Sequence, residues 1–260
     1  MRLIRIERRT FTAPAVFLAD DGQRAEVDAY FADLTRPFGT EPHRVRSGQS
    51  YGEMARELLA AVAPAEPVDL LVLAFSIHDL WPGRATATYL SRLCPGTPLS
   101  FAVCDQGSAA PFTGLRIIRD YGAPRALLIV VEQATLPYDS TAPTPAEHRG
   151  VAMLFGAIGG PRVTGLRQHP AVAPEAVAGQ ADRDVTELAA GSDGVRVVRS
   201  DALAAAWTGH PDHTTVPAGQ PTTGVWWHLA DALTGSAGLV VAADYDPDLR
   251  YLCLAGIEVR

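Results

Sequence analysis

The feature that most constrains the fold of this chain is a segment in which apolar strands alternate with helices at short spacing. Residues Asp69–Phe75 are almost continuously apolar, which is typical of a strand buried on both faces. The elements expected after it are a helix, a strand, a helix and a second buried strand, at Thr86–Leu93, Leu99–Val103, Ser108–Tyr121 and Ala126–Val131. This alternation predicts a parallel or mixed sheet covered by helices on both faces.

Similar elements flank this segment on both sides. In the first half we expect strands and helices at Leu3–Ile6, Val16–Leu18, Arg24–Leu34, Tyr51–Ala63 and Val151–Ile158. In the second half we expect helices at Asp184–Ala190, Asp201–Trp207 and Thr222–Leu233, and strands at Val195–Arg199, Leu239–Ala243 and Tyr251–Val259. The second half therefore repeats the order of elements of the first half, without sequence identity between the two.

This repetition predicts an α/β protein in which two sheets sandwich helices. The Ala- and Pro-rich stretch Gln168–Gln180 is the expected linker, and Asp244–Asp248 is the expected turn before the last strand. We expect two halves, at residues 1–167 and 168–260, packed as a single compact domain.

The composition excludes several classes of function. All 22 positive charges are Arg, so Schiff-base catalysis, a pyridoxal-phosphate anchor and a Walker-type phosphate loop are excluded. A net charge of −7 without a basic stripe argues against nucleic-acid binding. No apolar stretch is long enough to span a membrane, and the N-terminus does not resemble a signal peptide. The odd, scattered set Cys94, Cys104 and Cys253 predicts reduced thiols in a cytoplasmic protein with no metal site.

The turn at Cys104–Ser108 is the sharpest candidate for chemistry. A strand runs into a Gly-containing turn and then into a helix, whose N-terminus presents free N–H groups and a partial positive charge. Such a position lowers the pKa of a thiol and can stabilise an oxyanion. The sequence therefore offers two candidate nucleophiles, Cys104 and Ser108. The structural alternatives are a buried thiol at the end of a strand and a serine that only caps the helix.

Several segments together resemble the thiolase superfamily, and most closely its ketoacyl-ACP synthase III branch. The segments that carry this resemblance are Asp69–Phe75, Thr86–Thr88, the Ser108 turn, Gly122–Arg125, Glu147–Gly156, Gly219–Gly224 and Leu239–Val259. The resemblance implies a duplicated αβαβα layered sandwich, a dimer, and a nucleophile at the turn. Counting back from Leu115 places Ser108 at the nucleophile position, although a shift in the preceding strand leaves Cys104 open.

The sequence departs from that family at the catalytic positions. The resemblance implies a His after a strand of the second half, but Ser200 follows Val195–Arg199. The family's Asn is replaced by Gln220, which is one methylene longer. Because a condensing ketosynthase uses Cys, His and Asn, the set Ser108, Ser200 and Gln220 predicts no ordinary condensing activity.

Two histidines, His210 and His213, stand close in sequence to Gln220. One of them could act as a general base toward Ser108, with Asp212 or Asp105 as its orienting partner. The alternative is a polar surface loop that carries two solvated histidines.

Three functions remain open. The first is a non-condensing, ketosynthase-like partner subunit, in a homo- or heterodimer, of an active ketosynthase in an acyl or polyketide-type pathway. The second is a Ser- or Cys-dependent acyltransferase that uses acyl-CoA or acyl carrier protein. The third is an unrelated α/β binding protein. None of them requires a cofactor.

Overall fold

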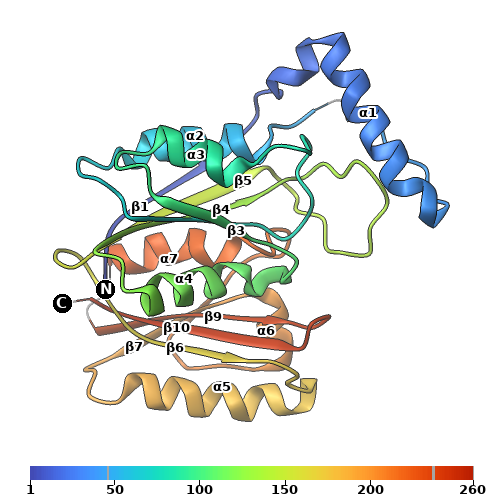
Figure 1. Ribbon diagram of the computed structural model, residues 1–260. Helices are drawn as coiled ribbons and strands as arrows, with labels where there is room; N and C mark the ends of the chain where they lie inside the picture. Colours follow the sequence, from blue (N-terminus) through green and yellow to red (C-terminus); the bar gives the residue numbers. More distant parts are fainter. Residues whose placement is uncertain (46, 236–237, 260) are drawn as a thin grey trace.

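The computed structural model describes residues 1–45, 47–235 and 238–259. Figure 1 shows layers of helices, sheet, helices, sheet and helices stacked on one another. Helices α2 and α3 form one outer layer, α4 and α7 lie between the two sheets, and α5 covers the opposite outer face. The predicted αβαβα layered sandwich is therefore confirmed.

The first half runs from β1 to β5. Its elements in chain order are β1 (Arg2–Thr10), η1 (Val16–Ala19), α1 (Asp21–Thr35), η2 (Arg36–Phe38), α2 (Tyr51–Val62), β2 (Leu70–Ala74), α3 (Thr86–Leu93), β3 (Leu99–Val103), η3 (Gly107–Ala109), α4 (Ala110–Tyr121), β4 (Arg125–Glu132) and β5 (Arg149–Gly156). The helix α1 projects from the layered body as an arm (Figure 1). Strand β2 is buried along its whole length, as its apolar sequence predicts.

The second half runs from β6 to β10. Its elements are β6 (Arg162–His169), α5 (Pro174–Ala189), β7 (Val195–Arg199), α6 (Asp201–Ala206), β8 (His213–Thr215), α7 (Gly224–Thr234), β9 (Gly238–Asp246) and β10 (Tyr251–Val259). The expected strands at Val195–Arg199 and Tyr251–Val259 are confirmed with their bounds.

The strand order shows that the two halves are topological copies. In the described chain the order is β3-β2-β4-β5-β1-β6-β10-β9-β7-β8, so the second half repeats the first in mirrored order. In the first half β5 is antiparallel to both β4 and β1, and β3, β2 and β4 are parallel to one another. In the second half β10 is antiparallel to both β9 and β6, and β8, β7 and β9 are parallel to one another. The two halves meet where Arg2 of β1 pairs with Arg162 of β6. The division at residue 167 itself stays a prediction.

The central layer holds the largest apolar core. Phe112 of α4 and Trp226 of α7 are both almost fully buried there, with ring centroids 4.7 Å apart. Burial of two large aromatic side chains removes several hundred Å² of apolar surface from water, on the order of 25 cal/mol per Å². Helices α4 and α7, each of which begins close to a candidate site residue, therefore pack against each other.

Three sequence expectations are wrong. Val16–Leu18 is part of a 3-10 turn, whose Phe17 is buried beneath the arm, and not a strand. The supposed linker Gln168–Gln180 holds the end of β6 and the start of α5, because Pro174 fits the first turn of a helix. The expected turn Asp244–Asp248 begins too early, since Asp244 still pairs with Cys253 inside the β9–β10 ladder.

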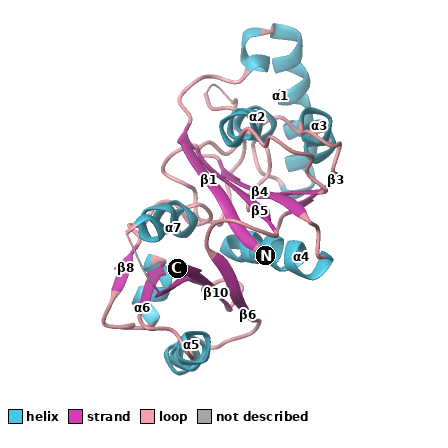
Figure 2. Cartoon of the chain, turned by 90° about the vertical axis from the view of Figure 1, so that its left-hand side faces the viewer, coloured by secondary structure: helices cyan, strands magenta, loops and turns pink. Residues whose placement is uncertain are grey.

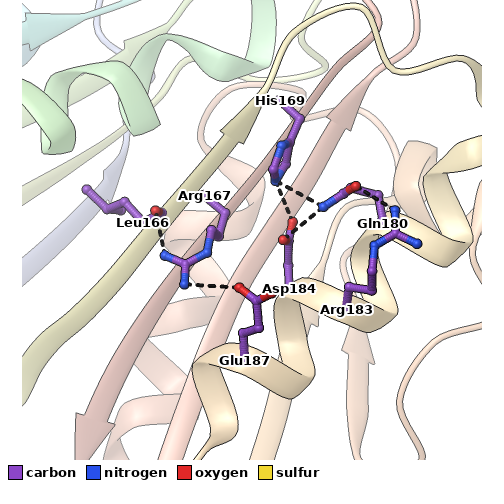
Figure 3. Close-up of polar contacts among 7 residues, drawn as sticks. All are labelled: Leu166, Arg167, His169, Gln180, Arg183, Asp184 and Glu187. Atoms are coloured by element: carbon purple, nitrogen blue, oxygen red, sulfur yellow. Dashed lines mark hydrogen bonds and ion pairs between the residues drawn. The ribbon is translucent and has the colours of Figure 1, made fainter.

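A polar network fastens α5 to β6 (Figure 3). The carboxylate of Asp184, which is almost fully buried, lies 2.8 Å from His169 Nε2 and accepts a hydrogen bond of 3.0 Å from Gln180 Nε2. Nearby, Arg167 reaches Glu187 at 3.3 Å. Since buried carboxylates are retained only when hydrogen-bonded, this network positions the outer helix on its sheet.

No helix among the described residues is long and apolar enough to cross a membrane.

Candidate functional site

The elbow between β3 and α4 has the tight geometry that its sequence predicts. After β3 the backbone takes positive φ at Asp105 (59°) and Gly107 (50°), and a 3-10 turn then leads into α4. The positive φ of Gly107 favours glycine, and a Cβ at this position would collide with the carboxylate of Asp246. Ser108 is thereby held at the entrance of the helix, largely buried.

The hairpin turn between β9 and β10 closes over this elbow. Asp246 Oδ2 accepts a hydrogen bond of 3.1 Å from the backbone N–H of Ser108. The other oxygen, Oδ1, accepts from the backbone N–H groups of Asp248 and Leu249, at 3.1 and 3.0 Å. The carboxylate of Asp246 therefore accepts hydrogen bonds both from the elbow and from the hairpin turn that covers the elbow.

A second carboxyl group, Asp244 on β9, lies inside the elbow. Asp244 is only 4% exposed, and the hydroxyls of Ser200 and Ser108 lie close enough to it to lower the pKa of its carboxyl group. Burial raises the pKa of Asp244 to about 7, against the opposing effect of the two hydroxyls and with a further contribution from the charge of Asp246. Asp244 thus joins a serine from each half of the molecule.

Ser200 has a structural role as well. It is the N-cap of α6, where its Oγ accepts a hydrogen bond of 3.1 Å from the N–H of Leu203. Its own N–H donates to the carbonyl of Ala243 at 3.1 Å, which holds it beside Asp244. The structure therefore brings Ser108 and Ser200 together, as the resemblance implied. The hydroxyls of both serines lie beside the carboxyl group of Asp244.

Cys104 lies beside the elbow and is half-buried. Its thiol donates to Asp105 Oδ2 at 3.3 Å. Partial burial and the neighbouring carboxylate raise the pKa of Cys104, so the thiol stays protonated. This is the opposite of the electropositive setting that activates a nucleophilic cysteine.

The remaining candidates lie in other surroundings. Gln220, at the start of the α7 region, donates to the carbonyl of Glu147 and accepts from Thr223 Oγ1, both at 3.4 Å. His213 begins the exposed edge strand β8, and its Nδ1 lies 2.5 Å from the carbonyl oxygen of His210. The N–H of Asp212 donates to His210 Nδ1 at 3.3 Å. These contacts keep the two histidines within their own loop, and a role toward Ser108 stays a prediction.

Another buried carboxyl group marks the start of α7. Glu132, at the end of β4, accepts hydrogen bonds from the backbone N–H groups of Thr222 and Thr223, at 2.9 and 3.2 Å, and from Thr223 Oγ1. Burial raises the pKa of Glu132 to about 7 against these hydrogen bonds. Glu132, from the other half, therefore caps the Thr222–Thr223 turn that leads into α7.

Sequence reasoning missed Asp244 and Asp246, because it assigned both to a surface turn. The available signal was alternation: Val240 and Ala242 face the central core, so Asp244 falls on the same face two residues later. Among the described residues no group of three or more His, Cys, Asp or Glu side chains could hold a metal ion.

Neither protein-family models nor curated protein sequences match this chain. Several solved structures are similar to it in fold. The acyltransferase ChlB3 has 16% identity and a TM-score of 0.63, with 99% of this chain and 97% of that chain covered. The tetronic acid condensing enzyme AbyA1 has 16% identity and a TM-score of 0.62, with 99% of both chains covered. FabH, the 3-oxoacyl-(acyl carrier protein) synthase III of Pseudomonas aeruginosa, has 20% identity and a TM-score of 0.63, with 100% and 98% covered.

These likenesses define the class of fold, which is thiolase-like. One of these similar structures is a 3-oxoacyl-(acyl carrier protein) synthase III, so the resemblance seen in the sequence is confirmed at the level of fold.

Proposed function

We propose that this chain is a ketosynthase-like subunit that performs no condensation and serves as the partner of an active ketosynthase in an acyl or polyketide-type pathway. The observation that carries the proposal is the hydrogen bond from the Ser108 N–H to Asp246. Negative charge that develops on a thioester carbonyl is stabilised by N–H donors placed beside the nucleophile. In this chain the N–H group of Ser108 already donates to the carboxylate of Asp246.

The second carboxyl group adds to this argument. Asp244 contacts the hydroxyls of Ser108 and Ser200 from the interior side. An acyl oxyanion at Ser108 would develop its charge next to two acidic groups, and repulsion raises the free energy of that state. Ser200 cannot replace a histidine as a strong donor, because its hydroxyl already caps α6 and meets Asp244.

The edge strand β3 is the proposed partner surface. It pairs with β2 on one side only, and its sequence, Leu99–Val103, contains no charged residue. Leu99 is 54% exposed. An uncharged, apolar edge strand is a template for pairing with another chain. The corresponding edge strand of the second half, β8, is short and polar, so β3 is the better candidate.

The test is co-expression with a ketosynthase encoded beside this chain. We expect the two to co-purify and the ketosynthase to gain activity, whereas Leu99→Asp in β3 should abolish the association. Thr214→Asp in β8 is the matched control and should leave it intact. A ketosynthase that neither binds this chain nor responds to it would refute the proposal. The proposed location is the cytoplasm, and a homodimer through the same strand is the alternative assembly.

One observation favours a second function, an acyltransferase that uses acyl-CoA or acyl carrier protein. The carboxylate of Asp244 contacts the Ser108 hydroxyl and could accept its proton as the oxygen attacks a thioester. Intact-mass measurement after incubation with acyl-CoA distinguishes the two functions. An adduct lost in both Ser108→Ala and Asp244→Asn supports the acyltransferase, and an adduct lost only in Cys104→Ala would identify the thiol instead. No adduct leaves the partner subunit as the better proposal.

A further inference from the structure

A groove between α2 and α3 is lined by two arginines and by one carboxyl group, that of Asp79. Its volume is about 360 Å³, and its lining includes Arg84, Arg92, Thr86, Thr88 and Tyr89. Within the described part of the chain, neither arginine forms an ion pair with a carboxylate. In a protein of net charge −7 this is a local excess of positive charge.

Arg84 is held in place by its surroundings. Its guanidinium carbon lies 3.4 Å from the ring centroid of Trp81, a stacked arrangement that leaves the edge N–H groups free to donate. Trp81 in turn packs on Phe17, with ring centroids 5.2 Å apart, and the backbone N–H of Trp81 donates to Asp79 Oδ1 at 3.2 Å. Because the stack limits the rotamers of Arg84, less conformational entropy is lost when it binds an anion.

The carboxyl group that lines the groove, Asp79, is already engaged. Its Oδ1 accepts hydrogen bonds from Tyr51 N, Trp81 N and Gln133 Nε2, at 3.1 to 3.2 Å. Asp79 is 9% exposed, and this carboxyl group organises the loop that carries Arg84. Its role in the groove is therefore structural, and the arginines are the groups that face a ligand.

The start of α3 supplies further donors. Its N-cap is Ala85, whose methyl group accepts no hydrogen bond, and Thr86 and Thr88 of the first turn line the groove. Several donors spread over one concave surface match the several oxygens of a phosphate group better than the two oxygens of a carboxylate.

An adjoining cavity suggests what the phosphate is attached to. It has a volume of about 310 Å³ and shares Arg84, Thr86 and Thr88 with the groove. Its lining also includes three aromatic residues, Phe75, Trp81 and Phe101. We propose that the Arg84–Arg92 groove binds a phosphate ester, with its organic group in the aromatic cavity. This proposal goes beyond the proposed function and does not depend on the chemistry of the elbow.

Calorimetric titration with phenyl phosphate, inorganic phosphate and acetate tests the proposal on the intact chain. Phenyl phosphate should bind most tightly and acetate most weakly. Arg84→Ala and Arg92→Ala should each weaken phenyl phosphate binding about tenfold or more, the expected loss for a hydrogen bond to a charged group. Arg84→Lys should weaken it less. Far-UV circular dichroism establishes that each variant is folded.

Arg183→Ala on α5 is the matched control, because it removes the same charge from the opposite outer layer (Figure 1). Its affinity should equal that of the unchanged chain. The proposal is overturned if phenyl phosphate does not bind, if acetate binds as tightly, or if Arg183→Ala weakens binding as much as Arg84→Ala. Equal binding of inorganic and phenyl phosphate would overturn the assignment of the aromatic cavity.

Discussion

The two helices of the central layer, α4 and α7, both begin beside a buried carboxyl group from the opposite half. Glu132 follows Val130 by two residues on β4, and Asp244 follows Ala242 by two residues on β9. Val130 and Ala242 face the same core, so the two carboxyl groups occupy equivalent places in the duplicated fold. Figure 2, which looks along the layers, shows α4 and α7 on opposite sides of the junction between the halves.

The partners of the two carboxyl groups differ. Glu132 receives two backbone N–H groups and one hydroxyl from the turn that leads into α7, and so caps that turn. Asp244 receives two side-chain hydroxyls, while the N–H of Ser108 goes to Asp246 instead. Glu132 therefore has a structural role as a cap. Asp244, at the equivalent position, lies in a site whose polar groups interact with one another.

Removing Glu132 should have the largest effect on stability. Glu132→Ala leaves two buried N–H groups without an acceptor and the Thr223 hydroxyl with only its long contact to Gln220, so the free energy of unfolding should fall by about 3 kcal/mol or more. Urea unfolding followed by circular dichroism measures it. Glu132→Gln keeps one acceptor and should lose less than half as much. A loss below about 1 kcal/mol in Glu132→Ala would show that α7 does not need this cap.

The pH dependence of stability should come next in size. Burial holds the pKa of Glu132 and Asp244 at about 7, well above the values of free carboxyl groups, so the folded chain keeps protons that the unfolded chain releases. Stability should therefore be greatest at low pH within this window and fall by on the order of 2 kcal/mol for each of the two groups as the pH rises from about 5 to 8.

The variant Asp244→Asn removes one of these titrations and should flatten that fall while Glu132 remains. Urea midpoints at several pH values give the slope. A slope unchanged in Asp244→Asn would mean that Asp244 does not titrate in this range.

The serine pair should have a smaller effect. Ser108→Ala and Ser200→Ala each remove one hydroxyl from Asp244, at about 1 kcal/mol each, and Ser200→Ala also removes the cap of α6. Because the two serines share one acceptor, the double variant should differ from the sum of the single variants. Strict additivity would argue against a shared network.

The smallest effect is expected for Asp246, which is partly exposed. In Asp246→Ala water can reach the N–H groups of Ser108, Asp248 and Leu249, so the loss should be below about 1 kcal/mol. Hydrogen exchange at the Ser108 amide should nevertheless accelerate. An unchanged exchange rate would show that the carboxylate does not protect this amide.

Much of the fold follows from local sequence pattern. The apolar run of β2 and the amphipathic spacing of α2 and α3 fix those elements, because their burial matches their periodicity. The position of Ser108 at an elbow and of Ser200 after β7 could also be predicted. Strand β6 could not, because its alternating polar residues resemble a loop, and the partners of Ser108 come from a strand more than 130 residues away.

The three cysteines have a practical consequence that follows from their burial. Cys94 and Cys253 are buried, and burial together with the charge of Asp244 raises the pKa of Cys253. Cys104 is half-exposed beside the elbow. A bulky maleimide dye should therefore label the native chain at Cys104 alone, which would give a fluorescent reporter of any ligand or subunit that approaches the elbow.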